Sequence, residues 1–456
     1  MILHDVEVEG VPGVDVRLEG DRVAEVGPDL VGGVAPGEAV LDGHGGALLP
    51  GLHDHHLHLR ALARARSSVP CGPPHVRRPE DLDRVLHDAA AKTPAGAWLR
   101  GVGHDERRGG ALDRRRLDAL APDHPVRIQH RSGHLWVLSS RALAVAGPAV
   151  EAAAPDGLLY DGDHLLHGLD PWSATEEEAA VAAVSVELAR LGVTGITDAS
   201  VTNDAGTTER FAAWQASGVL HQRVHLLGTT GVDGAHKLVL AEHDLPELDA
   251  LVAGIAADHA AGRPVAVHAA SRATVVLALA ALDAAGPLAG DRLEHASVAP
   301  PELVAWVARL GITVVTNPGF VAAHGDRYLD EVDPEDQPWL YRGRAFADAG
   351  APLAAGSDAP FGPIDPWRAM QAAVDRRTAA GARLGPEEGL TPETALACWT
   401  GTATAPGGPP RRVAPGHPAD LCLLHVPWLE ARRRLTADYV AATVVGGAVV
   451  PPQERP

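Results

Sequence analysis

The central part of the chain alternates apolar, strand-like runs with alanine-rich, helix-like segments, and this alternation constrains the fold more than any other feature. Residues 176–191 have a helical pattern and precede a strand-like run at 192–197, and the helix-like 248–261 precedes 264–268. Further strand-like runs occupy residues 292–295, 312–315 and 352–358. Strand-then-helix units repeated over about 350 residues predict an α/β fold, a (β/α)8 barrel of the TIM type, with an irregular insertion at about residues 65–170.

Both ends of the chain have a different pattern, in which short strand-like runs are separated by glycine and aspartate turns. These runs lie at residues 15–18, 22–26 and 39–41, and at 420–424 and 442–445. We therefore predict one small sheet domain built from both termini, residues 1–48 and 406–456, beside a barrel formed by residues 49–405.

Composition excludes several classes of protein. The chain has 456 residues, of which 46% are hydrophobic and 21% charged, as is ordinary for a globular enzyme. A formal charge of −20 argues against nucleic acid or an anionic membrane surface as a partner. The cysteines Cys71, Cys398 and Cys422 are widely spaced and suggest no disulfide framework. Without a signal-peptide pattern or an apolar run of membrane-spanning length, we expect a cytoplasmic protein.

A histidine-rich tract, Gly51-Leu52-His53-Asp54-His55-His56-Leu57-His58-Leu59, lies near the start of the predicted barrel. Strict alternation along a strand would put Asp54, His56 and His58 on one face and His53 and His55 on the other. His56 and His58 then bind one divalent ion from the same side, and Asp54 orients them. The alternative is a solvent-facing tract that binds metal without catalysis. We favour a built site, because the tract is short and follows an apolar lead-in.

Further candidate ligands end later strand-like runs, where the chemistry of a parallel barrel is found. They are His268, His295 and Asp358. Imidazole nitrogens with a carboxylate suit zinc or a similar first-row ion. Taken singly, each histidine could be an ordinary hydrogen-bonded residue and Asp358 could cap a turn. Their joint occurrence after an HxH strand favours a metal site.

Lysine is rare in this chain, since only Lys92 and Lys237 are lysines among 39 basic residues. A primary amine can lose its proton and react with carbon dioxide to form a carbamate, whereas a guanidinium stays protonated. Lys237 is therefore a candidate for a role that arginine cannot fill, although an ordinary surface lysine is the alternative.

These motifs together resemble the amidohydrolase superfamily, and within it the YtcJ-like group (amidohydrolase family 3). The similar segments cover nearly the whole chain and are Pro50 to Leu59, Ser132-Gly133-His134-Leu135-Trp136, Gly192-Val193-Thr194, Asp291 to Ala296, Gly356 to Pro360, Asp365-Pro366-Trp367 and Pro415 to Leu421. The resemblance implies a composite β-sandwich around a metal-dependent barrel that acts on a small molecule, with a homodimer as a common assembly.

The resemblance also implies a set of site residues. The metal ligands map to His56, His58, His268, His295 and Asp358. Lys237 maps to a carbamylated bridge between two metal ions, so that one or two ions, most simply zinc, are expected per subunit. His134 is implied to bind the substrate carbonyl or its oxyanion, with a structural loop histidine as the alternative.

The implied reaction is hydrolysis of a C–N bond in an amide, N-acyl or N-formyl substrate by water activated at the metal, with Asp358 as general base and then general acid. Alternatives are a deaminase of the same superfamily, an esterase or lactonase, and a degenerate metal-binding scaffold. The deaminase pattern has an acid soon after the fifth-strand histidine, and none follows His268 within residues 269–272. Four residues differ from those usual at these positions in the group: His53, His55, Ser139 and Asn317. They lie near the expected pocket, so they bear on the identity of the substrate more than on the hydrolytic chemistry.

Overall fold

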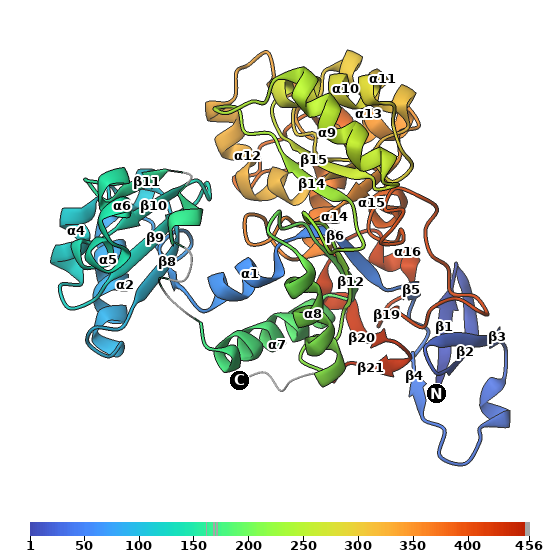
Figure 1. Ribbon diagram of the computed structural model, residues 1–456. Coiled ribbons are helices and arrows are strands. Elements are labelled where there is room, and N and C mark those ends of the chain that lie inside the picture. The colour runs from blue at the N-terminus through green and yellow to red at the C-terminus, as the bar shows by residue number, and fades with distance from the viewer. Residues whose placement is uncertain (161, 167–168, 170–171, 452–456) are drawn as a thin grey trace. The chain divides into compact units, whose positions relative to one another are not determined.

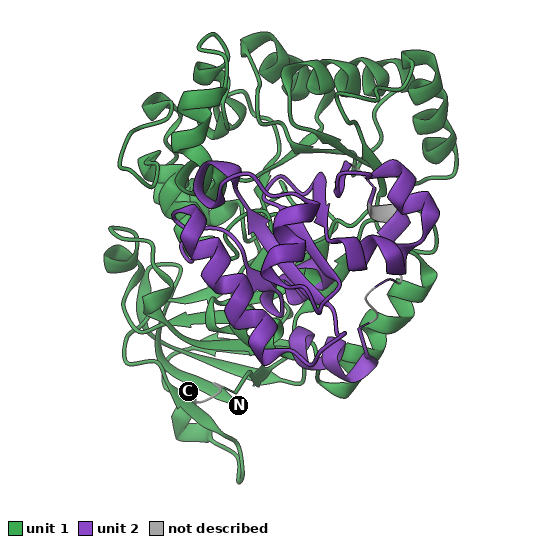
Figure 2. Ribbon diagram, turned by 90° about the vertical axis from the view of Figure 1, so that its left-hand side faces the viewer, with its two compact units in different colours: residues 1–59, 182–456 green, residues 60–181 purple. Residues whose placement is uncertain are grey.

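The computed structural model describes residues 1–160, 162–166, 169 and 172–451, and the chain divides into two compact units (Figure 2). Unit 1 consists of Met1–Leu59 and Ala182–Pro456, and unit 2 consists of Arg60–Val181. Helices α1 (Leu59–Arg66) and α7 (Ala174–Arg190) cross the two boundaries in the sequence. Each unit has its own sheets and its own buried apolar clusters.

Unit 1 contains a three-stranded and a five-stranded sheet in which neighbouring strands are parallel. The first has the order β13-β12-β6, with β6 (Leu52–Leu57), β12 (Val193–Asp198) and β13 (Arg223–Leu226). The second has the order β14-β15-β16-β17-β18, with β14 (His236–Val239), β15 (Val265–Ala269), β16 (Arg292–His295), β17 (Thr313–Thr316) and β18 (Leu353–Ala355).

Backbone contacts join these two sheets at both edges. Gly228, just after β13, forms a parallel bridge with His236 at the start of β14. At the other edge, the Asp358 amide donates to the His56 carbonyl over 2.7 Å. Asp358, in the segment after β18, is thereby held beside the end of β6.

Helices follow most of these strands and cover the five-stranded sheet. Helices α9 (Leu248–Ala260), α10 (Arg272–Ala285), α11 (Pro301–Leu310) and α13 (Gly343–Asp348) bury apolar side chains against β15 to β17 and lie together above β14 and β15 in Figure 1. Helix α10 begins at a capping box between Ser271 and Thr274, and Gly311 ends α11 in the left-handed conformation. The other helices of unit 1 are α8 (Ala205–Ser217), α12 (Gly319–Glu331), α14 (Pro366–Asp375), α15 (Pro392–Ala397) and α16 (Trp428–Ala431). The predicted α/β character is confirmed.

The two ends of the chain form a pair of four-stranded sheets. One has the order β3-β2-β1-β4, with β1 (Ile2–Val8), β2 (Val11–Glu19), β3 (Arg22–Gly27) and β4 (Val40–Asp42). The other has the order β21-β20-β19-β5, with β5 (Leu48–Pro50), β19 (Leu421–Leu424), β20 (Val440–Val445) and β21 (Ala448–Val449). Both contribute to one apolar core, in which Leu3 and Val16 meet Leu421 and Val444. The boundaries 1–48 and 406–456 for a separate domain stay a prediction.

Unit 2 contains regular elements where the sequence suggested an irregular insertion. Its sheet has the order β11-β10-β9-β8-β7, with β7 (Val69–Pro70), β8 (Leu99–His104), β9 (Val126–His130), β10 (Leu135–Leu138) and β11 (Leu158–Tyr160). Its helices are α2 (Pro79–Lys92), α3 (Glu106–Gly109), α4 (Arg114–Leu120), α5 (Ser140–Ala146) and α6 (Pro148–Ala153). Except for α2, these helices are too short for a 3.6-residue period to be visible in the sequence.

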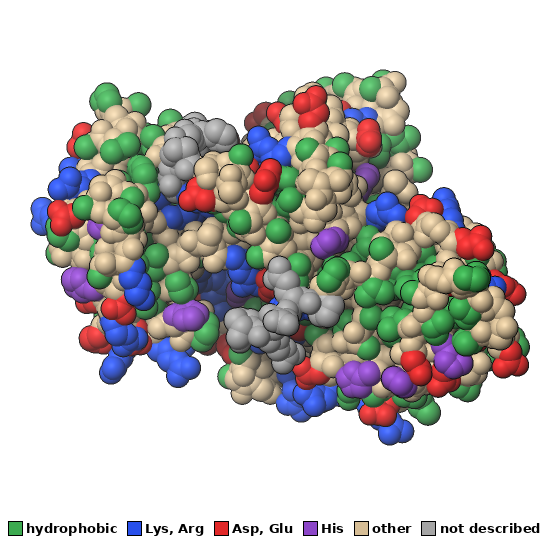
Figure 3. Space-filling model, turned by 90° about the horizontal axis from the view of Figure 1, so that it is seen from below, with side chains coloured by type: hydrophobic (Ala, Val, Ile, Leu, Met, Phe, Trp, Pro, Cys, Tyr) green, Lys and Arg blue, Asp and Glu red, His purple; other side chains and the backbone are tan. Residues whose placement is uncertain are grey.

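The surface carries charges of both signs. Acidic and basic side chains are interspersed over the face seen in Figure 3. Among the helices that the structure describes, none is both long and apolar enough to cross a membrane.

Candidate metal centre

Three of the predicted ligands converge where β6 meets the segment after β18. One donor atom from each of His56, His58 and Asp358 lies within 4.8 Å of the others. Asp358 Oδ1 lies 3.2 Å from His58 Nε2 and 3.6 Å from His56 Nε2. Two imidazoles and a carboxylate in this arrangement form a donor set that fits a divalent first-row ion.

The convergence depends on the backbone around Asp358. A Cβ atom added to Gly356 would lie 2.5 Å from both the backbone nitrogen and the Cβ of His56, so only glycine permits this approach. Asp358 itself has a φ of 54°, in the left-handed region that aspartate tolerates better than most residues. Unusual backbone conformations of this kind cluster at functional sites.

The remaining predicted histidine ligands adjoin this cluster. His295 Nδ1 lies 3.9 Å from Asp358 Oδ2, and the His295 and His56 ring centroids are 4.8 Å apart. Asn317 donates its amide to the Gly356 carbonyl over 3.0 Å, which orients its side-chain oxygen towards His295 Nδ1, 2.7 Å away. His295 Nδ1 therefore donates, and His295 Nε2 accepts from His268 Nδ1 over 2.9 Å. The structure thus brings all five predicted ligands into one region, with His58 and His268 partly buried and the others buried, and with His56, His58 and Asp358 as the tightest group.

Lys237 is buried in the same region. Its Nζ has no hydrogen-bond partner among the residues that the structure describes. Burial lowers the pKa of this amine, while the carboxylates of Glu294 and Asp358 oppose the shift. An unpartnered buried amine is costly unless a further group satisfies it, so Lys237 fits a site that holds an additional charged group.

The electrostatics of the cluster favour metal binding. Burial and the nearby Lys237 lower the pKa of His56 to about 3, although Glu294 opposes this shift. Burial and the neighbouring His295 lower the pKa of His268 to about 2. Burial by itself would raise the pKa of Asp358, but the hydrogen bond from His58 and the adjacent imidazoles bring it below its usual value. Neutral imidazoles and an ionised carboxylate are the protonation states that bind a metal.

Glu294 belongs to this region but was not predicted from the sequence. Its carboxylate contacts His56 Nδ1, and its side chain is completely buried. Its place near the site could be inferred from the sequence, because Glu294 directly precedes the predicted ligand His295 at the end of a buried strand, but its contact with His56 could not.

Asp54 contacts the backbone around the predicted ligands rather than an imidazole ring, and its role as an orienting residue stays a prediction. Asp54 Oδ1 accepts backbone amides, from His56 over 3.1 Å and from Ser357 over 2.9 Å. After Asp54 the register of the strand pair shifts, so that three residue steps along β6, from Asp54 to Leu57, match two along β12. Regular alternation of faces therefore does not continue through this part of β6.

His53 and His55 lie outside the metal-ligand cluster. Their rings stack with a centroid separation of 4.5 Å, and His53 Nε2 lies 2.9 Å from Thr197 Oγ1. Neither ring nitrogen of His55 has a hydrogen-bond partner in the described part of the chain.

Comparisons with known proteins agree with this geometry. A sequence model of the amidohydrolase family matches residues 39–451. The chain belongs to the amidohydrolase family. N-substituted formamide deformylase of Arthrobacter pascens is 28% identical over 459 residues, covering 84% of this chain and 84% of that protein. The putative amidohydrolase YtcJ of Bacillus subtilis (strain 168) is 25% identical, covering 74% of each chain. The resemblance to the YtcJ-like group is therefore confirmed.

A solved structure is also similar to this amidohydrolase. An uncharacterized metal-dependent hydrolase from Pyrococcus horikoshii OT3 matches with a TM-score of 0.73 and 20% identity, covering 92% of this chain and 95% of that one. Family membership makes the chain a hydrolase, and the His56–His58–Asp358 group supports a divalent metal as its cofactor.

In this amidohydrolase, His134 lies in unit 2, directly before β10, and its side chain is exposed. Its backbone amide donates to Ser132 Oγ over 3.3 Å. The nearby Ser139 caps helix α5 by accepting the Ala142 amide. A substrate-binding role for His134 stays a prediction.

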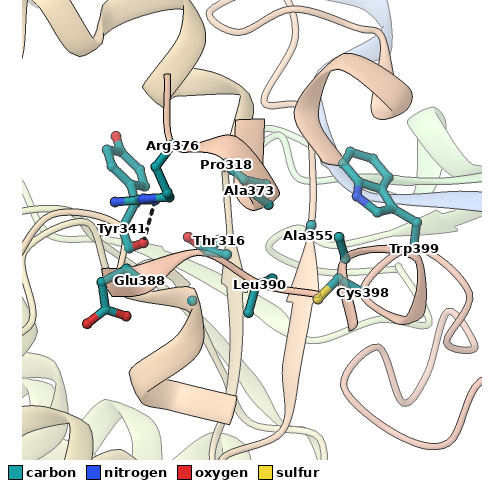
Figure 4. Close-up of a pocket in the computed structure, with 12 residues that line it drawn as sticks. Thr316, Pro318, Tyr341, Ala355, Ala373, Arg376, Glu388, Leu390, Cys398 and Trp399 are labelled. Carbon is teal, nitrogen blue, oxygen red and sulfur yellow. Dashed lines mark hydrogen bonds between the residues drawn. The ribbon is translucent and has the colours of Figure 1, made fainter. Parts of the chain in front are cut away.

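A separate cavity of unit 1 contains none of the predicted ligands (Figure 4). Its volume is about 20 Å³, which is enough for a single water molecule. Arg376 lies at one side and donates to the Tyr341 carbonyl over 2.9 Å, so it serves to hold the backbone. Cys398 lines the cavity, and burial raises the pKa of its thiol to about 12, which removes it as a nucleophile at neutral pH.

Proposed function

We propose that this amidohydrolase is a zinc-dependent enzyme that hydrolyses a C–N bond in a small amide, N-acyl or N-formyl compound. The observation that carries the proposal is the convergence of His56, His58 and Asp358 within 4.8 Å. The 28% identical relative named N-substituted formamide deformylase supports the N-formyl class as the first substrates to test.

The proposal includes a closed (β/α)8 barrel made of the three-stranded and the five-stranded parallel sheets. It is supported by the bridge between Gly228 and His236 at one pair of edges, and by the hydrogen bond from Asp358 to His56 at the other. In a closed barrel the carboxyl ends of the strands surround one site, which accounts for ligands from β6, β15, β16 and β18 in the same region.

When bound at this site, a divalent ion supplies Lewis-acid chemistry, polarising a carbonyl and lowering the pKa of a water molecule from about 15.7 to about 7. Asp358 acts as the general base, because its lowered pKa keeps it ionised and able to take a proton from the attacking water. It then returns that proton to the leaving nitrogen, so one carboxylate serves both steps. No serine or cysteine nucleophile is required.

Lys237 has a place in this proposal as a carbamate that would help to hold a second divalent ion. Its support is a buried Nζ without a hydrogen-bond partner among the described residues, and the surrounding imidazoles. The proposed enzyme works on a small molecule in the cytoplasm, without a nucleic-acid or membrane partner.

Substitution of Asp358 tests the proposal. The parent, Asp358→Asn and the matched control Asp330→Asn are purified, loaded with zinc and analysed for metal content. They are then assayed with N-substituted formamides, N-acyl amino acids, cyclic ureides and simple esters. Asp330 is exposed on α12, so its substitution is expected to change nothing.

The expected result is turnover of an amide or formamide by the parent and a loss of about 10²–10⁴-fold in Asp358→Asn that retains its fold and metal. Full activity of a folded Asp358→Asn would refute the role of this carboxylate. A parent that binds no divalent metal would refute the enzyme proposal and leave a degenerate scaffold. Turnover of esters alone would favour an esterase or lactonase, and release of ammonia from a ring substrate would favour a deaminase.

A further inference from the structure

A buried chain of polar side chains leads from β16 to the first predicted ligand. Arg292 Nη2 donates to Glu294 Oε2 over 3.2 Å, and Arg292 Nε contacts Glu294 Oε1. Glu294 Oε2 in turn contacts His56 Nδ1. The three side chains are 3%, 0% and 1% exposed, so water does not compete for these contacts.

Arg292 anchors this chain to the strand that carries the ligand. Its Nη2 also donates to the carbonyl oxygen of His55 over 2.7 Å. One guanidinium therefore holds both the Glu294 carboxylate and the backbone directly before His56. Lysine could not make this set of contacts, because it lacks the planar group with several donors.

The contact with Glu294 decides which nitrogen of His56 is available as a ligand. A carboxylate that receives two guanidinium contacts is ionised and can only accept hydrogen bonds. His56 Nδ1 must therefore carry the proton, which leaves the lone pair on Nε2. His56 Nε2 is the nitrogen that lies 3.6 Å from Asp358 Oδ1, inside the cluster of donor atoms.

We propose that Arg292 and Glu294 are positioning residues that fix the tautomer and the ring orientation of His56 for metal binding. The inference rests on the proposed function, since it assumes that His56 is a metal ligand. It assigns a purpose to a buried ion pair that would otherwise be a poor source of stability. Partners of this kind change metal affinity by about 10–100-fold in other metal sites.

The test uses the full-length protein and three variants. Glu294→Gln keeps the size of the side chain but can also donate a hydrogen bond to His56. The double variant Arg292→Met with Glu294→Gln removes both buried charges together, so that neither is left unpaired. Glu302→Gln, an exposed position on α11, is the matched control.

Two quantities are measured. Zinc affinity is determined by competition with a chromophoric chelator, and is expected to fall about 10–100-fold in Glu294→Gln and in the double variant, but not in Glu302→Gln. The tautomer of His56 is read in the metal-free protein from nitrogen-15 chemical shifts of labelled histidines, with the His56 signals assigned by their loss in His56→Asn. The parent is expected to be protonated at Nδ1, and Glu294→Gln to populate the Nε2-protonated form.

Zinc affinity within twofold of the parent together with an unchanged tautomer, in folded Glu294→Gln, would overturn the proposal. Failure of both Glu294→Gln and the double variant to fold would also overturn it, because the pair would then serve stability rather than positioning. If the parent binds no zinc, the proposed function fails, whereas the tautomer measurement still decides whether Glu294 sets the state of His56.

Discussion

Replacement of Gly356 by alanine is expected to damage both stability and activity, because the strand end after β18 packs directly on His56. The new Cβ would lie 2.5 Å from the His56 nitrogen and Cβ, and 2.8 Å from its Cα. Ordinary carbon–carbon contacts are about 3.5–4.0 Å, so one of the two backbones must move by about 1 Å. No flexible side chain is available to yield, since all three atoms belong to the backbone or its first branch.

The size of the expected losses in stability and turnover follows from that displacement. Overpacking in a well-packed interior costs about 1–3 kcal/mol in the free energy of unfolding. A shift of about 1 Å between His56 and Asp358 is expected to reduce turnover by about 10²-fold. Gly254→Ala is the matched control, since Gly254 is exposed in the middle of α9 and an added Cβ there meets no atom within 4 Å. It is expected to stabilise the protein by about 0.5–1 kcal/mol.

Urea unfolding followed by circular dichroism measures the stability of the parent and both variants, and a turnover assay with the best substrate from the screen measures activity. The same glycine-to-alanine change is expected to lower the free energy of unfolding at position 356 and to raise it at position 254. A Gly356→Ala protein with the stability and turnover of the parent would show that the strand end after β18 does not approach His56 so closely, and would remove the geometric basis of the site.

Two further predictions concern protons and metal. Because the pKa of His56 is lowered from 6.5 to about 3, the unfolded chain binds a proton below pH 6.5 that the folded protein does not, so the stability of the metal-free protein falls as the pH drops from 6.5 towards 3. His56 contributes a slope of at most about 1.4 kcal/mol per pH unit to the free energy of unfolding, and this contribution should be absent in His56→Asn. Urea titrations at several pH values measure both proteins, and equal slopes would contradict the lowered pKa of His56. Removal of divalent metal with a chelator is expected to lower the thermal midpoint and added zinc to restore it, with a stabilisation of about 2.7 kcal/mol at a zinc concentration 100 times the dissociation constant. A thermal midpoint that responds to neither treatment would contradict a resident metal.

The candidate ligands could be proposed from the sequence because their signals are local. The HxH pair lies at the end of β6, with His56 in the strand and His58 directly after it, and the later ligands end or follow buried strands whose apolar character is visible in a few residues. The expectation of strict alternation from Asp54 to His58 is also local. Alternation of faces holds for a regular strand, and only the pairing of β6 with β12 reveals the register shift after Asp54.

Glu294 shows a different limit of prediction from sequence, which is the contact between residues that are far apart in the chain. It meets His56 across 238 positions in the sequence, and nothing in the spacing of either residue specifies that contact. The regular structure of unit 2 was missed for another reason, since most of its helices are too short to show a period.

Three properties could be predicted from the sequence: the α/β character of the chain, its family, and the supply of imidazole and carboxylate donors at strand ends. These properties follow from residue types and their short-range pattern. The tertiary structure was needed to show which donors come within 4.8 Å of one another, which carboxylate contacts His56 Nδ1, and why residue 356 must be glycine. Each of these depends on the distance between strands that are remote in sequence, and packing of the whole unit sets that distance.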